Sequence, residues 1–280
     1  MNIGNNLFRF LIFLALLAGI LGGCKRSTIP PPYVFDEITK SQRELLGKRI
    51  NLAILTQPDI FPLRSSAGPN NEILYGYLQA YYDQATFFYR IDEEGGGPGS
   101  WNQNRQWRVY VLDIDSPNAF VIPGGDFFIT EGMLSQLNNE SELFALMSFE
   151  ASLLQSRLIL SELAEQYVAE DFIDLLELGN SKGGLDRQDL LVDFLGIEYE
   201  DFQLINIDET TAMHICDASA FRQQSLSQLI KSFPANSDSP WFLQKSYGSR
   251  IEKIESFISA PNCGNRSTDG SFQEEVLDLL

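Results

Sequence analysis

Apolar residues recur along this chain at spacings of three and four residues. That period is typical of helices that bury one face. The pattern predicts helices over residues 36–48, 71–90, 140–167, 186–195, 199–233 and 241–259. In the second of these, the predicted core face runs through Leu74, Leu78, Tyr81, Ala85 and Phe88.

The pattern changes between the second and third predicted helices. Three short runs rich in β-branched and aromatic residues span 107–113, 119–122 and 126–130, and Pro123-Gly124-Gly125 separates the last two. Such runs predict a small sheet with a tight turn. Before it, the Gly- and Pro-rich stretch 92–100 predicts a loop. After it, Asn138 or Asn139 is placed to cap the long helix.

The fold class that follows is α+β, mostly helical, with a small β-sheet and a long central helix. We expect one domain over residues 36–260 and a C-terminal tail over 261–280, because no repeat or second domain is visible.

The N-terminal segment predicts an export signal over residues 1–23. Its only charge is Arg9, and the apolar run over 10–21 is too short for a comfortable membrane span. The run ends in Leu21-Gly22-Gly23-Cys24, which resembles the lipobox of bacterial lipoproteins. We therefore expect Cys24 to carry acyl chains such as palmitate, although a chance cysteine after a signal anchor is the alternative. Residues 24–35 would then be the lipidated cysteine and a Pro-rich spacer, and Lys25 favours the periplasmic side of the outer membrane.

Acidic residues dominate the chain. The formal net charge is −18, and removal of residues 1–23, whose only charged residue is Arg9, gives −19. Such a surface repels nucleic acid, so nucleic-acid partners are excluded. With Cys24 acylated, Cys216 and Cys263 remain, and an oxidising compartment favours a disulfide between them, with two free thiols as the alternative.

A series of motifs appears in a fixed order over residues 106–258. It begins with Asn118-Ala119-Phe120 and Pro123-Gly124-Gly125, continues with Glu131-Gly132-Met133-Leu134 and the long helix, and ends with Arg250-Ile251. This order resembles the HtpX-like and BepA-like zinc metallopeptidases of family M48. The resemblance implies a gluzincin fold whose long helix carries H-E-x-x-H and whose later helix carries E-x-x-A-D. It also implies a substrate-lining strand and turn formed by Asn118, Ala119, Phe120, Pro123, Gly124 and Gly125.

The chain departs from this family at the metal. Where the resemblance implies His-Glu-x-x-His, the sequence reads Phe149-Glu150-Ala151-Ser152-Leu153, and Met213 stands in place of the outer aspartate. Glu150 and Glu209 remain at the positions of the base and the third ligand. Zinc prefers nitrogen and sulfur donors, so we expect no zinc, no other cofactor and no catalytic residue. Phe149, Leu153 and Met213 would fill the vacated space as an apolar plug.

Two functions remain open. The first is a membrane-tethered pseudopeptidase that binds polypeptide or a periplasmic or outer-membrane partner protein, by adding a strand to the edge at 118–122. The alternative is an active metalloendopeptidase with zinc, or another hydrolase that uses Glu150 and Glu209 as acid and base. The single histidine, His214, is either a substitute ligand beside Glu209 or an ordinary histidine.

Overall fold

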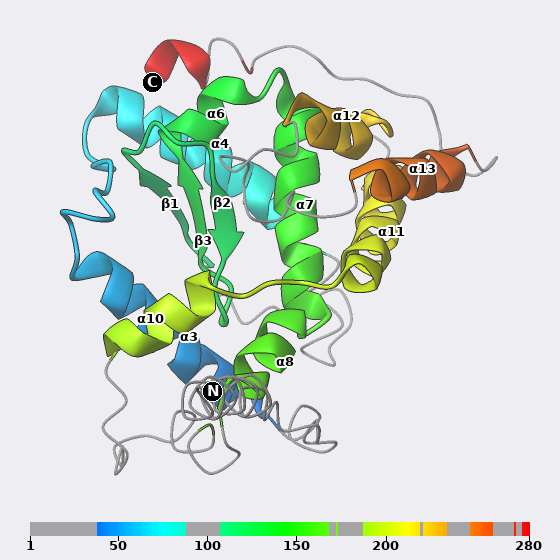
Figure 1. Ribbon diagram of the computed structural model, residues 1–280. Helices are drawn as coiled ribbons and strands as arrows, with labels where there is room; N and C mark the ends of the chain where they lie inside the picture. Colours follow the sequence, from blue (N-terminus) through cyan, green and yellow to red (C-terminus); the bar gives the residue numbers. More distant parts are fainter. Residues whose placement is uncertain are drawn as a thin grey trace, which may run out of the picture. The chain divides into compact units, whose positions relative to one another are not determined.

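A three-stranded mixed sheet forms the centre of the fold (Figure 1). The computed structural model describes residues 38–87, 107–167, 172, 187–218, 221–233, 247–259, 272 and 276–280. The strands are β1 (Val109–Leu112), β2 (Ala119–Val121) and β3 (Phe127–Thr130), in the order β1-β3-β2. β3 pairs with β1 in parallel and with β2 in antiparallel register, with Phe127 opposite both Val109 and Val121. The three predicted strands are confirmed.

The helices that surround this sheet are α3 (Lys40–Leu55), α4 (Pro69–Ala85), α6 (Glu131–Gln136), α7 (Glu140–Gln155), α8 (Leu158–Glu165), α10 (Arg187–Leu195), α11 (Asp201–Ala218), α12 (Ser225–Ser232) and α13 (Tyr247–Ile258). A short 3-10 helix, η2, spans Leu277–Leu279. A mostly helical α+β fold with a small sheet is therefore confirmed. The loop predicted over 92–100, residues 88–90 and residues 241–246 lie outside the described residues.

Two helices predicted as continuous are each broken. The helix predicted over 140–167 stops at Gln155, because Arg157 adopts a left-handed conformation (φ 58°), and α8 leaves at a bend of 55°. The helix predicted over 199–233 is divided into α11 and α12. The first helix was also placed too early, since Thr39 and Gln42 form a capping box that begins α3 at Lys40.

The buried face of α4 contains Leu74, Leu78 and Ala85, as predicted, but it also includes Tyr77 and Tyr82, which were predicted to lie off that face. Its buried residues are Leu74, Tyr77, Leu78, Tyr82 and Ala85, whereas Tyr81 is only half-buried and Phe88 lies outside the described residues. The Tyr82 hydroxyl donates a hydrogen bond to the carbonyl oxygen of Gly125 at 2.8 Å, and its ring stacks on Phe127. Tyrosine is buried readily when its hydroxyl finds such a partner.

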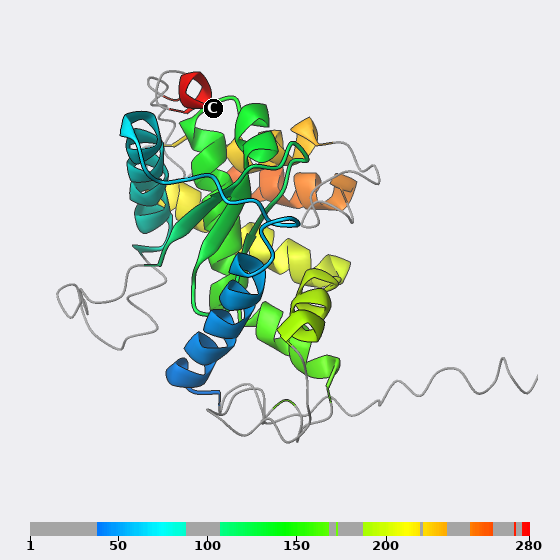
Figure 2. The same cartoon turned by 90° about the vertical axis from the view of Figure 1, so that its left-hand side faces the viewer.

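Side chains on the two faces of the sheet meet different helices. On one face, α4 and α7 pack against the strands, with Tyr82 of α4 on Phe127 of β3. On the other face, Tyr110, Phe128 and Phe120 stack in a row, and Phe194 of α10 meets the end of that row at 5.9 Å. Figures 1 and 2 show α10 beside the strands and α11, α12 and α13 beyond α7. The α7 helix is therefore enclosed between the sheet and the last three helices.

The Pro-Gly-Gly turn between β2 and β3 requires its glycines. Gly124 and Gly125 both have positive φ angles, of 96° and 98°. A Cβ atom on Gly125 would also lie 2.3 Å from the Trp107 ring, so no larger residue fits there. Close packing around this turn fixes the end of the sheet.

The start of α7 agrees with the predicted cap. The Asn139 side chain accepts a hydrogen bond from the Glu142 backbone N–H at 3.1 Å, and the Glu142 carboxylate accepts one from the Asn138 N–H at 2.9 Å. Within the described ranges, no single helix has the length and apolar composition to cross a membrane, and only the bent pair of α7 and α8 has both together.

Candidate functional site

The middle of α7 lies inside the protein core. Every residue from Glu140 to Leu153 is buried, and Phe149, Glu150 and Leu153 are fully inaccessible to solvent. A helix that is buried on every side is enclosed by other elements rather than lying beside a cleft. The residues that match the family's catalytic motif therefore do not face solvent.

The Glu150 side chain is bound to the sheet. Its Oε2 atom accepts a hydrogen bond from the Val121 backbone N–H of β2 at 2.9 Å, whereas Oε1 has no hydrogen-bond partner among the described residues. Burial raises the pKa of this carboxyl well above its ordinary value of 4.5, and the Val121 hydrogen bond opposes that shift. Glu150 thus links α7 to the outer edge of β2.

Phe149 lies against a buried ion pair. The Arg250 guanidinium of α13 stands 5.4 Å from the centre of the Phe149 ring, within the range of a cation–π interaction. The same guanidinium donates two hydrogen bonds to Asp208 of α11, Nε to Oδ2 at 2.7 Å and Nη2 to Oδ1 at 2.8 Å. Burial raises the Asp208 pKa, and the Arg250 charge opposes that rise. Three helices meet at this pair.

The α11 helix presents a different face to α7 than the family resemblance implies. Its buried residues include Asp208, Thr211, Ala212 and Ile215, and the Thr211 hydroxyl lies 2.8 Å from the Ser152 hydroxyl of α7. Glu209 instead lies on the outer side, 39% exposed, and accepts from Lys253 of α13 at 3.0 Å.

Two further residues of α11 also lie away from Phe149 and Leu153. Met213 is 45% exposed, so the expected apolar plug is wrong for this residue, whereas Phe149 and Leu153 are buried as expected. His214 is half-buried. The physical reason is helix geometry: Met213 is five residues beyond the inward-facing Asp208, about 140° around the helix axis.

The residues present do not fit a zinc ion. Two of the positions that would supply imidazoles hold buried apolar side chains, and Glu209, at the third ligand position, points outward to Lys253. Within the part of the chain that the structure describes, no group of three or more His, Cys, Asp or Glu side chains could hold a metal. We therefore derive no chemical step through zinc.

Part of this sequence is similar to known proteins. Residues 100–185 match peptidase family M48. This chain carries an M48 family domain. The mitochondrial metalloendopeptidase OMA1 of Schizosaccharomyces pombe is 38% identical over 47 residues. That match covers 17% of this chain and only 14% of the length of OMA1.

The β2 edge of the M48 domain is closed. Ala119 and Val121 are completely buried, the Ala119 N–H donates to the Asn118 side chain at 2.9 Å, and the Val121 N–H donates to Glu150. The segment from α10 to α11 crosses in front of the sheet and α7 (Figure 1). Buried and exposed residues alternate along this segment: Ile197 and Tyr199 are buried, whereas Glu198 and Glu200 are exposed. Burial raises the pKa of the Tyr199 hydroxyl, and the nearby Glu150 carboxyl adds to that rise.

The β1 edge is covered as well. The Val109 N–H donates to the Gln79 side chain at 3.1 Å, the Val111 N–H donates to the Tyr75 hydroxyl at 3.2 Å, and the Val111 carbonyl accepts from the Arg64 N–H at 2.9 Å. Neither edge of the sheet is therefore open to a peptide that adds a strand. The strand addition that the sequence led us to expect at the edge over 118–122 does not fit this structure.

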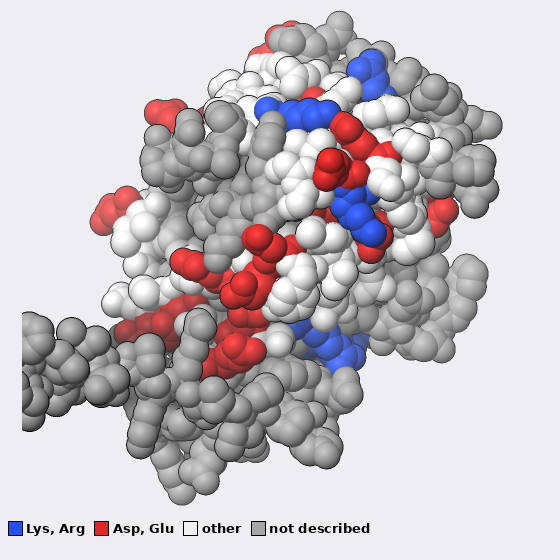
Figure 3. Space-filling view, turned by 45° about the vertical axis from the view of Figure 1, so that its right-hand side comes forward, with Lys and Arg blue, Asp and Glu red and all other residues white. Residues whose placement is uncertain are grey.

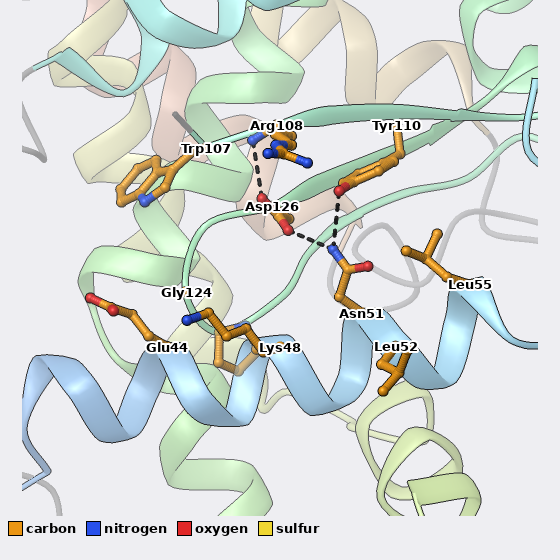
Figure 4. A pocket seen from close by; sticks show the side chains of 12 residues that line it. Glu44, Lys48, Asn51, Leu52, Leu55, Trp107, Arg108, Tyr110, Gly124 and Asp126 are labelled. Atoms are coloured by element: carbon orange, nitrogen blue, oxygen red, sulfur yellow. Dashed lines mark hydrogen bonds between the residues drawn. The ribbon is translucent and has the colours of Figure 1, made fainter. Parts of the chain in front are cut away.

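Two cavities lie on the sheet face opposite α7. One, of about 270 Å³, is lined by Phe61, Leu112, Ile114, Ser116, Asn118, Phe120, Thr130, Phe194, Leu195 and Tyr199. The other, of about 500 Å³, is a groove between α3 and the start of β1 that reaches the Pro-Gly-Gly turn (Figure 4). Sequence reasoning missed both, although α3 carries outward-facing Lys48, Leu52 and Leu55 on one stripe.

Proposed function

We propose that the M48 domain of this chain is non-catalytic and serves as a binding protein for polypeptide or a partner protein in the bacterial cell envelope. The single observation that carries this proposal is the position of Glu150. The residue at the place of the general base is fully buried and is used to hold β2.

A general base must reach the water that it deprotonates. Glu150 is completely shielded from solvent and its Oε2 is engaged by Val121, while burial favours the protonated, neutral form that cannot accept a proton. Phe149 and Leu153 stand at the two positions where the family has histidine ligands, and neither side chain can bind the metal that would activate the water. This environment supports a structural role for Glu150.

The hydrolase alternative needs Glu150 and Glu209 to act on one substrate. Glu150 faces β2 from inside the core, whereas Glu209 is on the outer side of α11 with Lys253. Paired acid and base groups must both contact the reacting atoms. The different partners of the two carboxylates favour the non-catalytic proposal.

The location remains part of the proposal, because residues 1–37 lie outside the described residues. The lipobox-like Leu21-Gly22-Gly23-Cys24 supports export, acylation of Cys24 and anchoring on the periplasmic side of the envelope, and Lys25 favours the outer membrane. Two or more acyl chains on one cysteine anchor a protein firmly, which one chain does not.

Surface features favour a protein as the partner. Exposed apolar side chains gather on α3, α10 and the segment after α3, and include Leu52, Leu55, Ile60, Leu63, Val192 and Leu195. Burial of apolar surface is the main favourable contribution to most protein–protein association, and exposed apolar patches mark such interaction sites. The face that carries α11 and α13 shows a band of acidic side chains (Figure 3), which fits the exclusion of nucleic acid.

Metal analysis and two functional assays on one preparation test the proposal. The full-length protein, purified in detergent without chelator, should hold no stoichiometric zinc and should leave unfolded casein uncut. It should also slow the aggregation of a denatured model protein when present in equal amounts. Cleavage of casein that Glu150→Gln abolishes would refute the non-catalytic proposal, and no effect on aggregation would refute the binding role.

A further inference from the structure

The groove between α3 and β1 has a firm floor and mixed walls (Figure 4). Its floor is the Pro-Gly-Gly turn, on which α3 rests so closely that a Cβ atom on Gly47 would lie 1.5 Å from the Pro123 carbonyl oxygen. Its cavity volume, about 500 Å³, is within the range of ordinary ligand sites. Because the floor is formed by tightly packed backbone, the groove is present before any ligand binds.

Asn51 is held in one orientation at the centre of this groove. Its side-chain nitrogen Nδ2 donates to Asp126 Oδ2 at 2.5 Å and lies 3.4 Å from the Tyr110 hydroxyl. Asp126 is itself fixed, because its Oδ1 accepts from the Arg108 backbone N–H at 3.1 Å. The Asn51 carbonyl oxygen Oδ1 therefore points away from Asp126, and among the described residues it receives no hydrogen bond. It is an acceptor available to an N–H donor on a ligand.

Two cations border the same groove. Lys48 and Arg108 are both exposed, and neither forms an ion pair with a carboxylate in the described part of the chain. The Asp126 carboxylate between them already accepts two hydrogen bonds. Two carboxylates, Glu44 and Asp126, line the groove as well, and the Arg108 charge acts on Asp126. Exposed cations without an ion pair at a cavity favour an anionic group on the ligand.

Apolar side chains close one end of the groove. Leu52 and Leu55 are 41% and 38% exposed, and Figure 4 places them on the α3 side beyond Asn51. An apolar group bound there would remove its own surface and that of both leucines from water.

We propose that this groove binds the C-terminal residue of a polypeptide. The free carboxylate would bind Lys48 and Arg108, the N–H of the last peptide unit would donate to Asn51 Oδ1, and the apolar side chain of the last residue would pack on Leu52 and Leu55. The inference rests on the proposed binding function and names which part of the polypeptide is recognised. It differs from strand addition, which the closed sheet edges disfavour.

The three features together favour a C-terminus over other anions. A free inorganic anion would use the cations but neither the Asn51 acceptor nor the leucines. An internal aspartate or glutamate offers a carboxylate, but its own residue has no apolar side chain to place on Leu52 and Leu55. Only the last residue of a chain joins a carboxylate, a neighbouring N–H and an apolar side chain within one unit.

Fluorescence polarisation with the full-length protein in detergent tests this inference. The probe is a labelled hexapeptide that ends in leucine with a free carboxylate, compared with the same peptide ending in an amide and with an amidated peptide carrying an internal glutamate. We expect the free acid to bind about tenfold or more tightly than both others. The amide loses the charge-assisted hydrogen bonds, and the internal glutamate cannot place a carboxylate and an apolar side chain from one residue. Lys48→Gln and Arg108→Gln should each abolish most of this difference, whereas Lys253→Gln, at an exposed lysine of α13, should leave it unchanged.

Equal affinity for the acid and the amide in the wild-type protein would overturn the inference, and this comparison needs no variant that could misfold. Tight binding of the internal-glutamate peptide would replace it with recognition of acidic side chains. If the acid and amide bind equally while denatured protein is still kept from aggregating, the groove inference fails and the binding function stands. If neither peptide nor denatured protein binds, the binding function itself fails.

Discussion

The Glu150 carboxylate accepts a hydrogen bond from the Val121 backbone N–H at 2.9 Å inside the buried core. That contact joins the helix at the catalytic position of the M48 domain to the strand that the family resemblance assigns to substrate. It gives the glutamate a structural role that requires no metal.

Two replacements of Glu150 should separate the contribution of its hydrogen bond to stability from the contribution of its charge. Glu150→Gln retains an oxygen that can accept from Val121, so its unfolding free energy at low pH should stay near the wild-type value. Glu150→Ala leaves a buried N–H without a partner and should lower that free energy by roughly 1–3 kcal/mol. Chemical denaturation of both variants measures the difference, and equal stability of Glu150→Ala and the wild type would contradict the contact.

The dependence of the unfolding free energy on pH should also reflect the raised pKa of Glu150. Because the pKa of Glu150 is raised in the folded state, the folded protein holds this proton more tightly than the unfolded chain. Its contribution to stability is complete below the ordinary pKa of 4.5 and falls as pH rises from there toward the folded pKa. Glu150→Gln removes this loss, so the stability of the variant relative to the wild type should increase with pH above that point. A constant difference across pH would argue against a buried, protonated carboxyl.

The Asp208–Arg250 pair and the Glu209–Lys253 pair form a matched comparison between α11 and α13. The first pair is fully buried and the second is exposed. Asp208→Ala should lower the unfolding free energy by about 3–5 kcal/mol, because it leaves the Arg250 charge buried without its partner. Glu209→Ala should change it by about 1 kcal/mol or less. Thermal and chemical unfolding report both values, and a larger effect from Glu209 would show that the register of α11 is wrong.

Rebuilding the histidines should not rebuild a metal centre. Phe149→His with Leu153→His places two imidazoles in a packed apolar core, beside Arg250 and without a third ligand that faces them. We expect a loss of several kcal/mol in unfolding free energy, about 3–5 kcal/mol for removal of the buried Phe149 ring alone. Zinc added in excess should not restore the melting temperature. A rise in melting temperature that tracks zinc concentration would show that a third ligand is available after all.

Acylation of Cys24 should decide where the protein resides. Cys24→Ala should release the protein from the membrane fraction, because the lipid anchor is lost. Metabolic labelling with an alkyne fatty acid should mark the wild type and not the variant. Membrane retention of Cys24→Ala without label would favour an uncleaved signal anchor.

The Cys216–Cys263 disulfide stays a prediction, because Cys263 lies outside the described residues. If it forms, it closes a loop long enough to stabilise the folded protein by roughly 2–4 kcal/mol. The unfolded, non-reduced mature protein should then show no free thiol by colorimetric titration. Two titratable thiols would disprove the bond.

Local chemistry alone determined the sheet region and the start of α7. The β-branched runs, the Pro123-Gly124-Gly125 turn and the Asn139 cap depend on contacts between residues near in sequence, and each was predicted within one or two residues. The sequence also determined that Phe149 and Leu153 cannot supply imidazoles to a metal. Nothing in the fold could reverse that loss.

Tertiary packing decided which side chains meet. Asp208 and Glu209 are both acidic and adjacent, and neighbouring residues on a helix point about 100° apart. Only the packing of α11 against α7 and α13 decides that Asp208 turns inward to Arg250 while Glu209 and Met213 face outward. The strand edge closed by Glu150 and the groove at Asn51 likewise depend on residues far apart in sequence. Such contacts form only when the whole chain is folded, because no local spacing along the sequence encodes the partner.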